Sequence, residues 1–363
     1  MWKSPRQLAK KHKGQPRKAS AMGYVFQIPI VLCWSLAATL AAPGDGSASV
    51  TNIFSPLSTP AEAIYENALL VLVICAGIFL VVGGLLAYTI IRFRHRPGDA
   101  GREPPQVYGS SQIELAWTVV PILIVFVLIL VTARAIYDVQ GAVPPADALN
   151  VTVVGHQWWW EIRYPELGIV TANELHVPVS ESSRPRPTFL KLESADVAHS
   201  FWVPQLAGKT DLIPNRTNRM WIEPTQPGTY LGNCAEYCGT QHAHMLLRVI
   251  AHPPGEFEQW VAAQRQPPLE DPQARVGREV FFSTSCVNCH TINGTRARGT
   301  FGPDLTHLMS RETLAAGAAP NTPEMLKAWV RDPQTLKVGS LMPNMQMTDT
   351  ELEHLVTYLL SLK

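Results

Sequence analysis

Two long apolar segments stand out from an otherwise mixed pattern of polar and apolar residues. Residues 68–91 and 115–133 contain no charged side chain. Each is long enough for a helix across a hydrocarbon core of about 30 Å, which takes roughly 20 residues. Residues 92–102 between them hold four arginines, and basic loops of this kind stay on the cytoplasmic side. The pattern predicts a transmembrane hairpin over residues 56–143, with everything after Tyr137 on the outer face of the membrane.

A β-rich pattern follows the hairpin. Residues 150–164 are rich in Val, Trp and Tyr, and we expect one strand whose side chains alternate between two faces. Trp158 and Trp160 would share one face and Trp159 the other, so at least one large ring would be exposed. Further short strands, separated by Pro and Gly, are expected at residues 188–193, 220–223, 227–231 and 246–251. The succession predicts a β-sandwich or barrel over residues 144–256.

The last part of the chain changes to helical periodicity. Residues 257–271 begin with a short helix around 257–263 and continue as a proline-rich spacer, which we interpret as a linker. An amphipathic helix is expected at residues 273–283. The final helix begins at Thr348-Asp349-Thr350-Glu351, a capping box, and carries its apolar residues on one face. These elements predict a small helical domain over residues 272–363.

The near-neutral composition hides an asymmetry of charge. The formal net charge is +1, yet seven Lys and Arg precede Met22, and the residues from Asp138 onward carry 18 basic and 23 acidic groups. The basic start runs into the apolar residues 24–42 and then into small residues, as in a secretory signal. Residues 1–55 are therefore predicted to be a basic leader with a signal peptide. The apolar core is long for such a signal, and an uncleaved third membrane helix is the alternative.

The strongest chemical signal lies between Gly232 and Met245. Two thiols, an imidazole and a thioether follow one another there, as Cys234, Cys238, His242 and Met245. A thioether is a poor ligand for zinc and a good one for copper, so the set favours copper over zinc. A helix would spread these side chains over roughly 16 Å, too far for one metal site. We therefore expect a loop folded around its metal and delivered by the strand 227–231.

The second thiol changes the kind of copper site that is expected. A mononuclear blue-copper site needs one Cys, two His and a weak Met, so Cys234 is surplus to it. A second thiolate can bridge two copper ions, and such a site needs one more ligand from elsewhere. The best candidate is His199, while His244 is a rival imidazole that spacing does not exclude. A disulfide or two buried thiols are the alternatives, but neither requires the His and the Met.

A second redox motif, Cys286-Val287-Asn288-Cys289-His290, has the spacing for attachment of c-type haem. The thiols of Cys286 and Cys289 would form thioethers to the haem and His290 would bind the iron, although the motif alone also fits a zinc or redox site. Residues 302–305, Gly-Pro-Asp-Leu, resemble the haem-edge loop of class I cytochromes c. Met342 stands where those cytochromes place an axial methionine, and a His/Met pair raises the haem potential. The competitors for this position are Met345 and Met347.

The copper motif, together with residues 195–204 around His199, resembles the copper A centre of subunit II of haem-copper cytochrome c oxidases. The second motif is similar to the fused C-terminal cytochrome c domain of the caa-type members. This resemblance implies a multidomain membrane protein with a two-helix hairpin, a cupredoxin-like β-domain and an all-α class I cytochrome c domain. It also implies the ligand sets: His199 and Met245 for one copper, His242 and the carbonyl of Glu236 for the other, and Cys234 and Cys238 as bridges.

The same resemblance implies roles for residues beyond these ligands. The Glu236 side chain would face a magnesium ion shared with subunit I. Trp158 matches the tryptophan placed between the copper centre and the donor cytochrome. Residues 112–121 open the second membrane span as in that family, where Glu114 would lie near the entrance of a proton path. An acid at a helix start also suits the helix dipole, so plain capping is an equal alternative.

The implied function is electron transfer within a proton-pumping cytochrome c oxidase. Electrons would enter at haem c, pass to the copper pair and leave for haem a in subunit I, where oxygen is reduced to water. The expected partners are subunits I and III, the membrane, and a cytochrome c or a quinol–cytochrome c reductase as donor, without nucleic acid. We expect a multi-pass protein of the bacterial inner or plasma membrane, with both redox domains on the periplasmic or extracellular side.

Four other classes share part of this pattern. Quinol oxidase subunit II has the same hairpin and fold but no copper ligands. Nitrous oxide reductase has a similar copper loop without a membrane hairpin before it. A copper-delivery protein would not need a haem domain. A membrane-anchored copper and haem carrier for another terminal reductase is the remaining alternative.

Overall fold

The computed structural model describes most of the chain after residue 50. Described are residues 51–96, 103, 106–145, 148–181, 183, 185–268 and 271–363. Residues 1–50 of the predicted leader and the arginine at position 102 of the basic loop lie outside the described residues.

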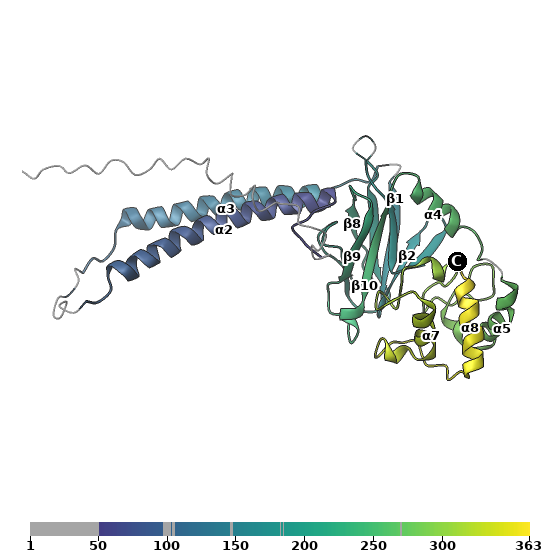
Figure 1. Ribbon diagram of the computed structural model, residues 1–363. Helices are drawn as coiled ribbons and strands as arrows, with labels where there is room; N and C mark the ends of the chain where they lie inside the picture. The colour runs from purple at the N-terminus through teal and green to yellow at the C-terminus, as the bar shows by residue number, and fades with distance from the viewer. Residues whose placement is uncertain are drawn as a thin grey trace, which may run out of the picture. The chain divides into compact units, whose positions relative to one another are not determined.

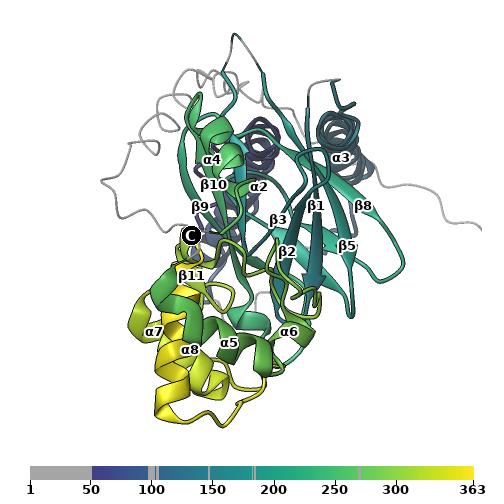
Figure 2. The ribbon, with the colours of Figure 1, turned by 90° about the vertical axis from the view of Figure 1, so that its right-hand side faces the viewer.

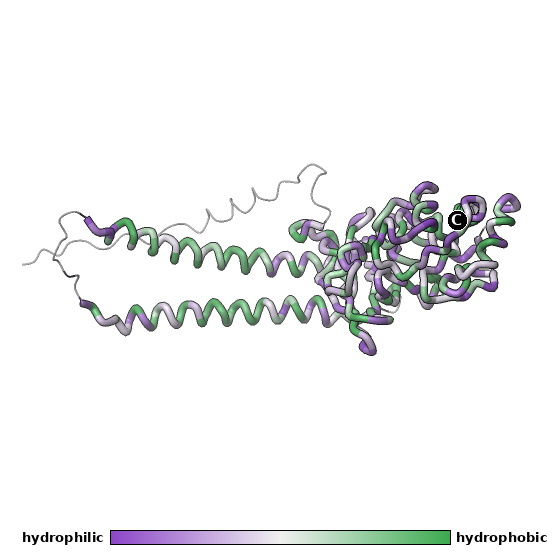
Figure 3. The backbone as a smooth tube through the Cα atoms, turned by 90° about the horizontal axis from the view of Figure 1, so that it is seen from below, coloured by the Kyte–Doolittle hydropathy of each residue, from purple (hydrophilic) through white to green (hydrophobic). Residues whose placement is uncertain are grey.

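Two long helices form the predicted hairpin. Helix α2 spans Thr59–Arg92, helix α3 spans Ser111–Gln140, and the two run side by side (Figure 1). Both extend beyond the apolar segments found in the sequence because each continues into polar turns at its ends, as the colouring of Figure 3 shows. Both are long and apolar enough to cross a membrane. Trp221 donates its Nε1–H to the carbonyl of Val139 (2.7 Å), which ties the end of α3 to the β-domain.

The β-domain is a sandwich of two five-stranded sheets (Figure 2), as predicted. One sheet has the order β3-β2-β1-β5-β8 and the other the order β4-β10-β9-β6-β7. Buried side chains from both sheets, such as Leu190, Leu175 and Val249, share one core. The strands are β1 Leu149–His156, β2 Trp159–Tyr164, β3 Ile169–Ala172, β4 Glu174–Pro178, β5 Thr188–Ser194, β6 His199–Trp202, β7 Thr210–Leu212, β8 Asn218–Ile222, β9 Gly228–Cys234 and β10 Leu246–His252.

The single strand predicted over residues 150–164 is wrong. The chain reverses at Gln157 and Trp158, and β1 and β2 pair as an antiparallel hairpin in which His156 lies opposite Trp159. Trp160 is fully buried, whereas Trp158 and Trp159 are half-buried. The reversal escaped prediction because the turn contains neither Gly, Pro, Asn nor Asp, the residues that mark short hairpin turns.

Helix α4, Glu256–Gln264, packs on the sandwich. Phe257 and Val261 are buried in the β-domain core, and the ring of Trp260 stacks on that of His176 with centroids 4.3 Å apart. The prediction of a linker over residues 257–271 is therefore wrong for its first part, because the β-domain covers the apolar face of this helix.

The C-terminal domain is a set of short helices. Helix α8, Asp349–Ser361, crosses helix α5, Arg275–Ser283, at Gly277. There is no room for a side chain there, because a Cβ on Gly277 would lie 1.8 Å from the carbonyl oxygen of His354. The predicted capping box is confirmed: the Thr348 hydroxyl accepts from the Glu351 N–H (3.3 Å), and the Glu351 carboxylate accepts from the Thr348 N–H (2.9 Å). The elements are η2 Pro272–Ala274, α5 Arg275–Ser283, α6 Cys286–Cys289, η3 Leu308–Ser310, β11 Thr313–Leu314, β12 Ala319–Pro320, α7 Pro323–Arg331, η4 Pro333–Thr335 and α8 Asp349–Ser361.

Candidate copper and haem sites

Two neighbouring strands and one loop bring the predicted metal ligands together. His199 is the first residue of β6 and Cys234 is the last of β9, and these strands pair with Phe201 opposite Cys234. The chain then folds back through a loop and the short 3-10 turn η1, His242–His244, before β10 begins. The expected loop is therefore present, and the segment is not a continuous helix.

The soft donor atoms form one compact cluster. The Sγ atoms of Cys234 and Cys238 lie 3.8 Å apart, and Cys238 Sγ is 3.6 Å from His242 Nδ1 and 3.8 Å from Met245 Sδ. His199 Nδ1 lies 4.0 Å from Cys234 Sγ. His199 and Met245 are fully buried, both cysteines nearly so, and His242 is half-buried.

The two remaining candidates of this loop differ in position. The carbonyl oxygen of Glu236 accepts from Cys234 Sγ at 3.1 Å, so the backbone of Glu236 reaches the cluster while its side chain is exposed. His244 is exposed, and its Nδ1 is hydrogen-bonded to Gln241 Oε1 (2.7 Å). The geometry thus favours His242 over His244 as the imidazole donor.

Charged and polar groups around the cluster orient its ligands. His199 Nε2 bonds Asp196 Oδ1 (2.8 Å), which leaves Nδ1 facing Cys234 and places a carboxylate behind the imidazole. Burial is the largest influence on the pKa of His199 and would lower it, but the interactions with Asp196 and Cys234 together outweigh burial, and the pKa is raised. The contact with the Cys238 thiol lowers the pKa of the Cys234 thiol. The ring of His199 also lies against Gly155, where a Cβ would come within 2.7 Å of it.

Trp158 reaches the loop that carries Cys238 directly. Its Nε1–H donates to the carbonyl oxygen of Cys238 (3.0 Å), and Gln157 Nε2 donates to the same oxygen (2.8 Å). Because Trp158 lies in the hairpin turn, its ring is free to cover this loop. Gly239 leaves room for it, since a Cβ there would lie 3.1 Å from the indole.

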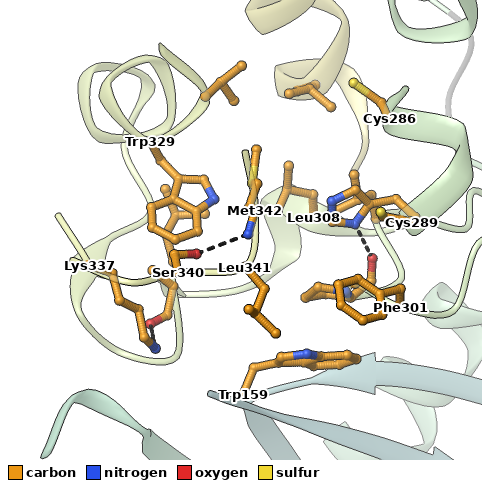
Figure 4. A pocket seen from close by; sticks show the side chains of 18 of the residues that line it. Trp159, Cys286, Cys289, Phe301, Leu308, Trp329, Lys337, Ser340, Leu341 and Met342 are labelled. Carbon is orange, nitrogen blue, oxygen red and sulfur yellow. Dashed lines mark hydrogen bonds between the residues drawn. The ribbon is translucent and has the colours of Figure 1, made fainter. Parts of the chain in front are cut away.

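A separate cavity of about 290 Å³ collects the predicted haem residues (Figure 4). Cys286, Cys289, His290 and Met342 all line it. His290 donates its Nδ1–H to the carbonyl of Pro303 (2.7 Å). In the neutral ring the proton is then on Nδ1, and the lone pair of Nε2 is available to a metal. Burial lowers the pKa of His290, which favours the neutral imidazole.

The methionines divide into two groups. Met342 and Met345 both line the cavity, and Figure 4 shows Met342 directed into it between Trp329 and Leu308. Met347 does not line the cavity and packs instead against the core of the helical domain. Position alone therefore leaves Met345 as the competitor of Met342.

Sequence patterns gave no sign of Lys337. This lysine is only 4% exposed, and its Nζ donates to the carbonyls of Trp158 (2.8 Å), His244 (2.9 Å) and Ala315 (2.9 Å). Burial lowers its pKa to about 7. A lysine in a loop ordinarily predicts an exposed side chain, and no local signal marks one that is covered by another domain.

Three family models match successive parts of the chain. Cytochrome C oxidase subunit II, transmembrane domain, matches residues 46–134; Cytochrome C oxidase subunit II, periplasmic domain, matches residues 184–251; and Cytochrome c matches residues 274–363. The three matches fall on the hairpin, the β-domain and the C-terminal helical domain.

Similar proteins carry related names. Cytochrome c oxidase subunit 2 of Alkalihalophilus pseudofirmus is 36% identical over 316 residues, which cover 85% of this chain and 90% of that protein. The subunit of the same name from Bacillus sp. (strain PS3) is 34% identical, covering 75% of this chain and 80% of its own. Quinol oxidase subunit 2 of Bacillus cereus is 29% identical, covering 59% and 73%. Among solved structures, the periplasmic domain of subunit II of cytochrome oxidase from Bradyrhizobium japonicum is 30% identical and covers 34% of this chain and 97% of that chain, with a TM-score of 0.32.

Proposed function

Because the chain belongs to the cytochrome c oxidase subunit II family, in the form with a C-terminal cytochrome c domain, we propose that it carries electrons from its own haem c to a copper A centre. From there electrons go to haem a in subunit I, which reduces oxygen to water within a proton-pumping oxidase. This chain transfers electrons only. The single observation that carries the proposal is the approach of His199 to the thiols of Cys234 and Cys238, with all their donor atoms within 4.8 Å of one another.

The donor set of the β-domain fits a pair of copper ions. It offers two thiols, two imidazole nitrogens, a thioether and a backbone carbonyl in a buried cluster, a combination of soft ligands that suits copper. Bound copper would supply one-electron redox chemistry without proton transfer. The ligands assigned in this proposal are His199, Cys234, the carbonyl of Glu236, Cys238, His242 and Met245.

The residues of the helical cavity fit a covalent haem. Cys286 and Cys289 would form the two thioethers, and His290 and Met342 would bind the iron. The Pro303 carbonyl holds the His290 ring by its Nδ1–H, and Gly302 lies so close that a Cβ there would come within 2.7 Å of that ring. Groups that contact a metal-bound imidazole without touching the metal fix the orientation of its ring.

Further assignments rest on the family resemblance. We propose that the Glu236 side chain faces a magnesium ion at the border with subunit I, and that Glu114 lies near a proton path of that subunit. Subunit III and a cytochrome c or quinol–cytochrome c reductase complete the proposed partners. Helices α2 and α3 would cross the bacterial inner or plasma membrane, with both redox domains on its outer side.

The copper donors argue against a quinol oxidase subunit, which would not need them. A metal count on the purified full chain tests this directly, and we expect a copper pair and one haem. A copper-delivery protein would surrender its copper to a chelator and show no turnover with reduced cytochrome c in the assembled oxidase, whereas we expect turnover and retention of copper.

Replacement of a bridging thiol is the sharper test. In Cys234→Ser, electron paramagnetic resonance should lose the mixed-valence signal of the copper pair, while the optical absorption of haem c stays intact. Cys75→Ser is the matched control, because Cys75 lies exposed on α2. A wild-type copper signal in Cys234→Ser would contradict the two-thiolate site.

A further inference from the structure

The helical domain contacts the backbone on both sides of Met245, a proposed copper ligand. The carbonyl of His244 accepts a hydrogen bond from Lys337 Nζ (2.9 Å). The N–H of Leu246 donates to the carbonyl of Ala316 (3.0 Å). These two groups belong to the two peptide units that flank Met245, so the backbone beside this ligand is held by the other redox domain.

A third contact reaches the start of the same segment. Gln241 is buried, and its Nε2 donates to the carbonyl of Val338, the residue after Lys337. The Oε1 of Gln241 is hydrogen-bonded to His244 Nδ1 (2.7 Å). The side chain of Gln241 therefore joins the short turn η1, which begins at the proposed ligand His242, to the helical domain.

The loop that makes the second of these contacts lies between β11 and β12 and has an unusual backbone. Ala315 and Ala316 have φ angles of 53° and 60°, in the left-handed region that residues other than glycine seldom adopt. Such a conformation persists only where the surroundings enforce it. Here the carbonyl of Ala315 accepts from Lys337 Nζ (2.9 Å), and the carbonyl of Ala316 accepts from Leu246. The contact with the β-domain therefore helps to hold the loop in this conformation.

Gly317 shows how closely this loop fits the β-domain. A Cβ at Gly317 would lie 2.8 Å from the Cβ of Leu246, which is closer than two such carbons approach in folded proteins. Leu246 directly follows Met245, so a side chain at position 317 would displace either the loop or the backbone beside the ligand. The Met245 thioether is fully buried, and its Sδ lies 3.8 Å from Cys238 Sγ. An axial thioether tunes the reduction potential of a copper site.

We propose that Lys337 and the loop of residues 315–317 are positioning residues for the thioether of Met245, so that the docked helical domain sets the reduction potential of the copper pair. The inference rests on the proposed ligation of copper by Met245. Both groups act through the peptide units beside this ligand, one through the His244 carbonyl and the other through the Leu246 N–H.

The test is the copper reduction potential and the electron paramagnetic resonance spectrum of the purified full chain. Gly317→Ala should change the equilibrium constant for copper reduction about tenfold, which is about 59 mV for one electron, and should alter the hyperfine pattern of copper. The absorption and potential of haem c should stay as in the wild type.

Gly294→Ala is the matched control for this variant. Gly294 lies in the same domain and has a similar φ of 77°, but a Cβ there would meet nothing within 4 Å. Both substitutions therefore strain a left-handed backbone, and only Gly317→Ala presses on Leu246. Equal copper potentials and spectra in the two glycine variants would overturn the positioning role.

Lys337→Leu supplies a second, independent variant, because it removes the ammonium that bonds the carbonyls of His244 and Ala315. The copper potential and spectrum should change, and hydrogen exchange at the Leu246 amide should become about tenfold faster. Lys327→Leu is its control, since the partly exposed Lys327 pairs with Glu353 within the helical domain. Fast exchange at Leu246 together with wild-type copper signals would show that the helical domain does not position the ligand.

The outcomes keep the two proposals apart. If the wild-type chain lacks the mixed-valence copper signal, the proposed function itself fails. If that signal is present and Gly317→Ala and Lys337→Leu match their controls, the present inference is wrong and the proposed function stands. Met245→Leu calibrates the measurement: it should shift the copper potential, and an unchanged potential would remove the ligand on which the inference depends. Should Gly317→Ala not fold, the comparison of the two lysine variants decides.

Discussion

Glu174 offers a direct test of how the helical domain is held on the β-domain. This residue begins β4 and is fully buried. Its carboxylate accepts hydrogen bonds from the N–H of Glu312 (2.9 Å), the N–H of Thr313 (2.9 Å) and the hydroxyl of Thr313 (3.0 Å), all in the helical domain. Glu174→Gln keeps the shape of the side chain and removes both the charge and one acceptor oxygen.

The size of the effect follows from these bonds. Hydrogen bonds to a charged group contribute about 1.5–3 kcal/mol each and neutral ones about 0.5–1.5 kcal/mol. When the carboxylate becomes an amide, each of the three hydrogen bonds is weakened by the difference, and the summed loss is roughly 3 kcal/mol. Burial works against the carboxylate and raises the pKa of Glu174 in spite of its donors, so removal of the charge returns part of this cost. We expect a net loss of about 2 kcal/mol in the free energy of local opening.

Hydrogen exchange measures this local opening better than global unfolding, which is not a single transition in a chain of several domains. A loss of about 2 kcal/mol should speed exchange of the Glu312 and Thr313 amides about 30-fold in Glu174→Gln. Glu312→Gln is the matched control: it removes the partly exposed ion pair with Arg248, and such pairs contribute about 0–1 kcal/mol. Unchanged exchange in Glu174→Gln, or an equal change in both variants, would refute the assignment of Glu174 as the buried anchor.

Three further predictions concern the two sites and the core. Met342→Leu should lower the reduction potential of haem c in a redox titration, because a His/Met pair raises it, whereas Met345→Leu should leave the potential near that of the wild type; the reverse result would exchange their roles. Asp196→Asn should weaken copper binding about 10–100-fold in a chelator competition, since the carboxylate orients His199, and full retention of affinity would contradict that role. Burial lowers the pKa of His176 from 6.5 to about 3, so between these pH values the unfolded chain binds a proton there that the folded chain does not, and stability should fall by about 1.4 kcal/mol for each pH unit from 6.5 down to about 3. A pH series of thermal unfolding should therefore show a shallower acid dependence in His176→Gln, and an identical dependence would count against this explanation.

The candidate ligand residues of this chain could be predicted from the sequence more completely than the path of its backbone. Ligand type and spacing were enough to select the copper loop and the haem motif because both depend on residues close together in sequence. The hairpin turn at Gln157 and Trp158 was missed for a physical reason: two antiparallel strands and one long strand share the same alternation of polar and apolar residues.

Contacts between domains were beyond prediction for a different reason. Lys337 and Glu174 are charged residues whose local sequence predicts exposure, and only the packing of a second domain buries them. Helix α4 was predicted as an element, but its place on the sandwich depends on a face of the β-domain that no pattern within the helix describes. The sequence of one partner in a contact carries little information about the other.

The buried charges between the helical domain and the β-domain favour one docked arrangement over shifted ones, and they add little to its stability. If the helical domain separated, Lys337 and Glu174 would regain water, so their hydrogen bonds add little net affinity. If it docked in a shifted register, each would stay buried without its partners, which costs several kcal/mol for every unpaired charge. Arg311 acts in the same way, because its buried guanidinium donates to the Asp304 carbonyl (2.5 Å) within its domain and reaches the Thr171 hydroxyl (3.4 Å) across the border. A polar interface of this kind fixes the register in which the helical domain sits on the β-domain, because every shifted arrangement leaves at least one buried charge without its partners.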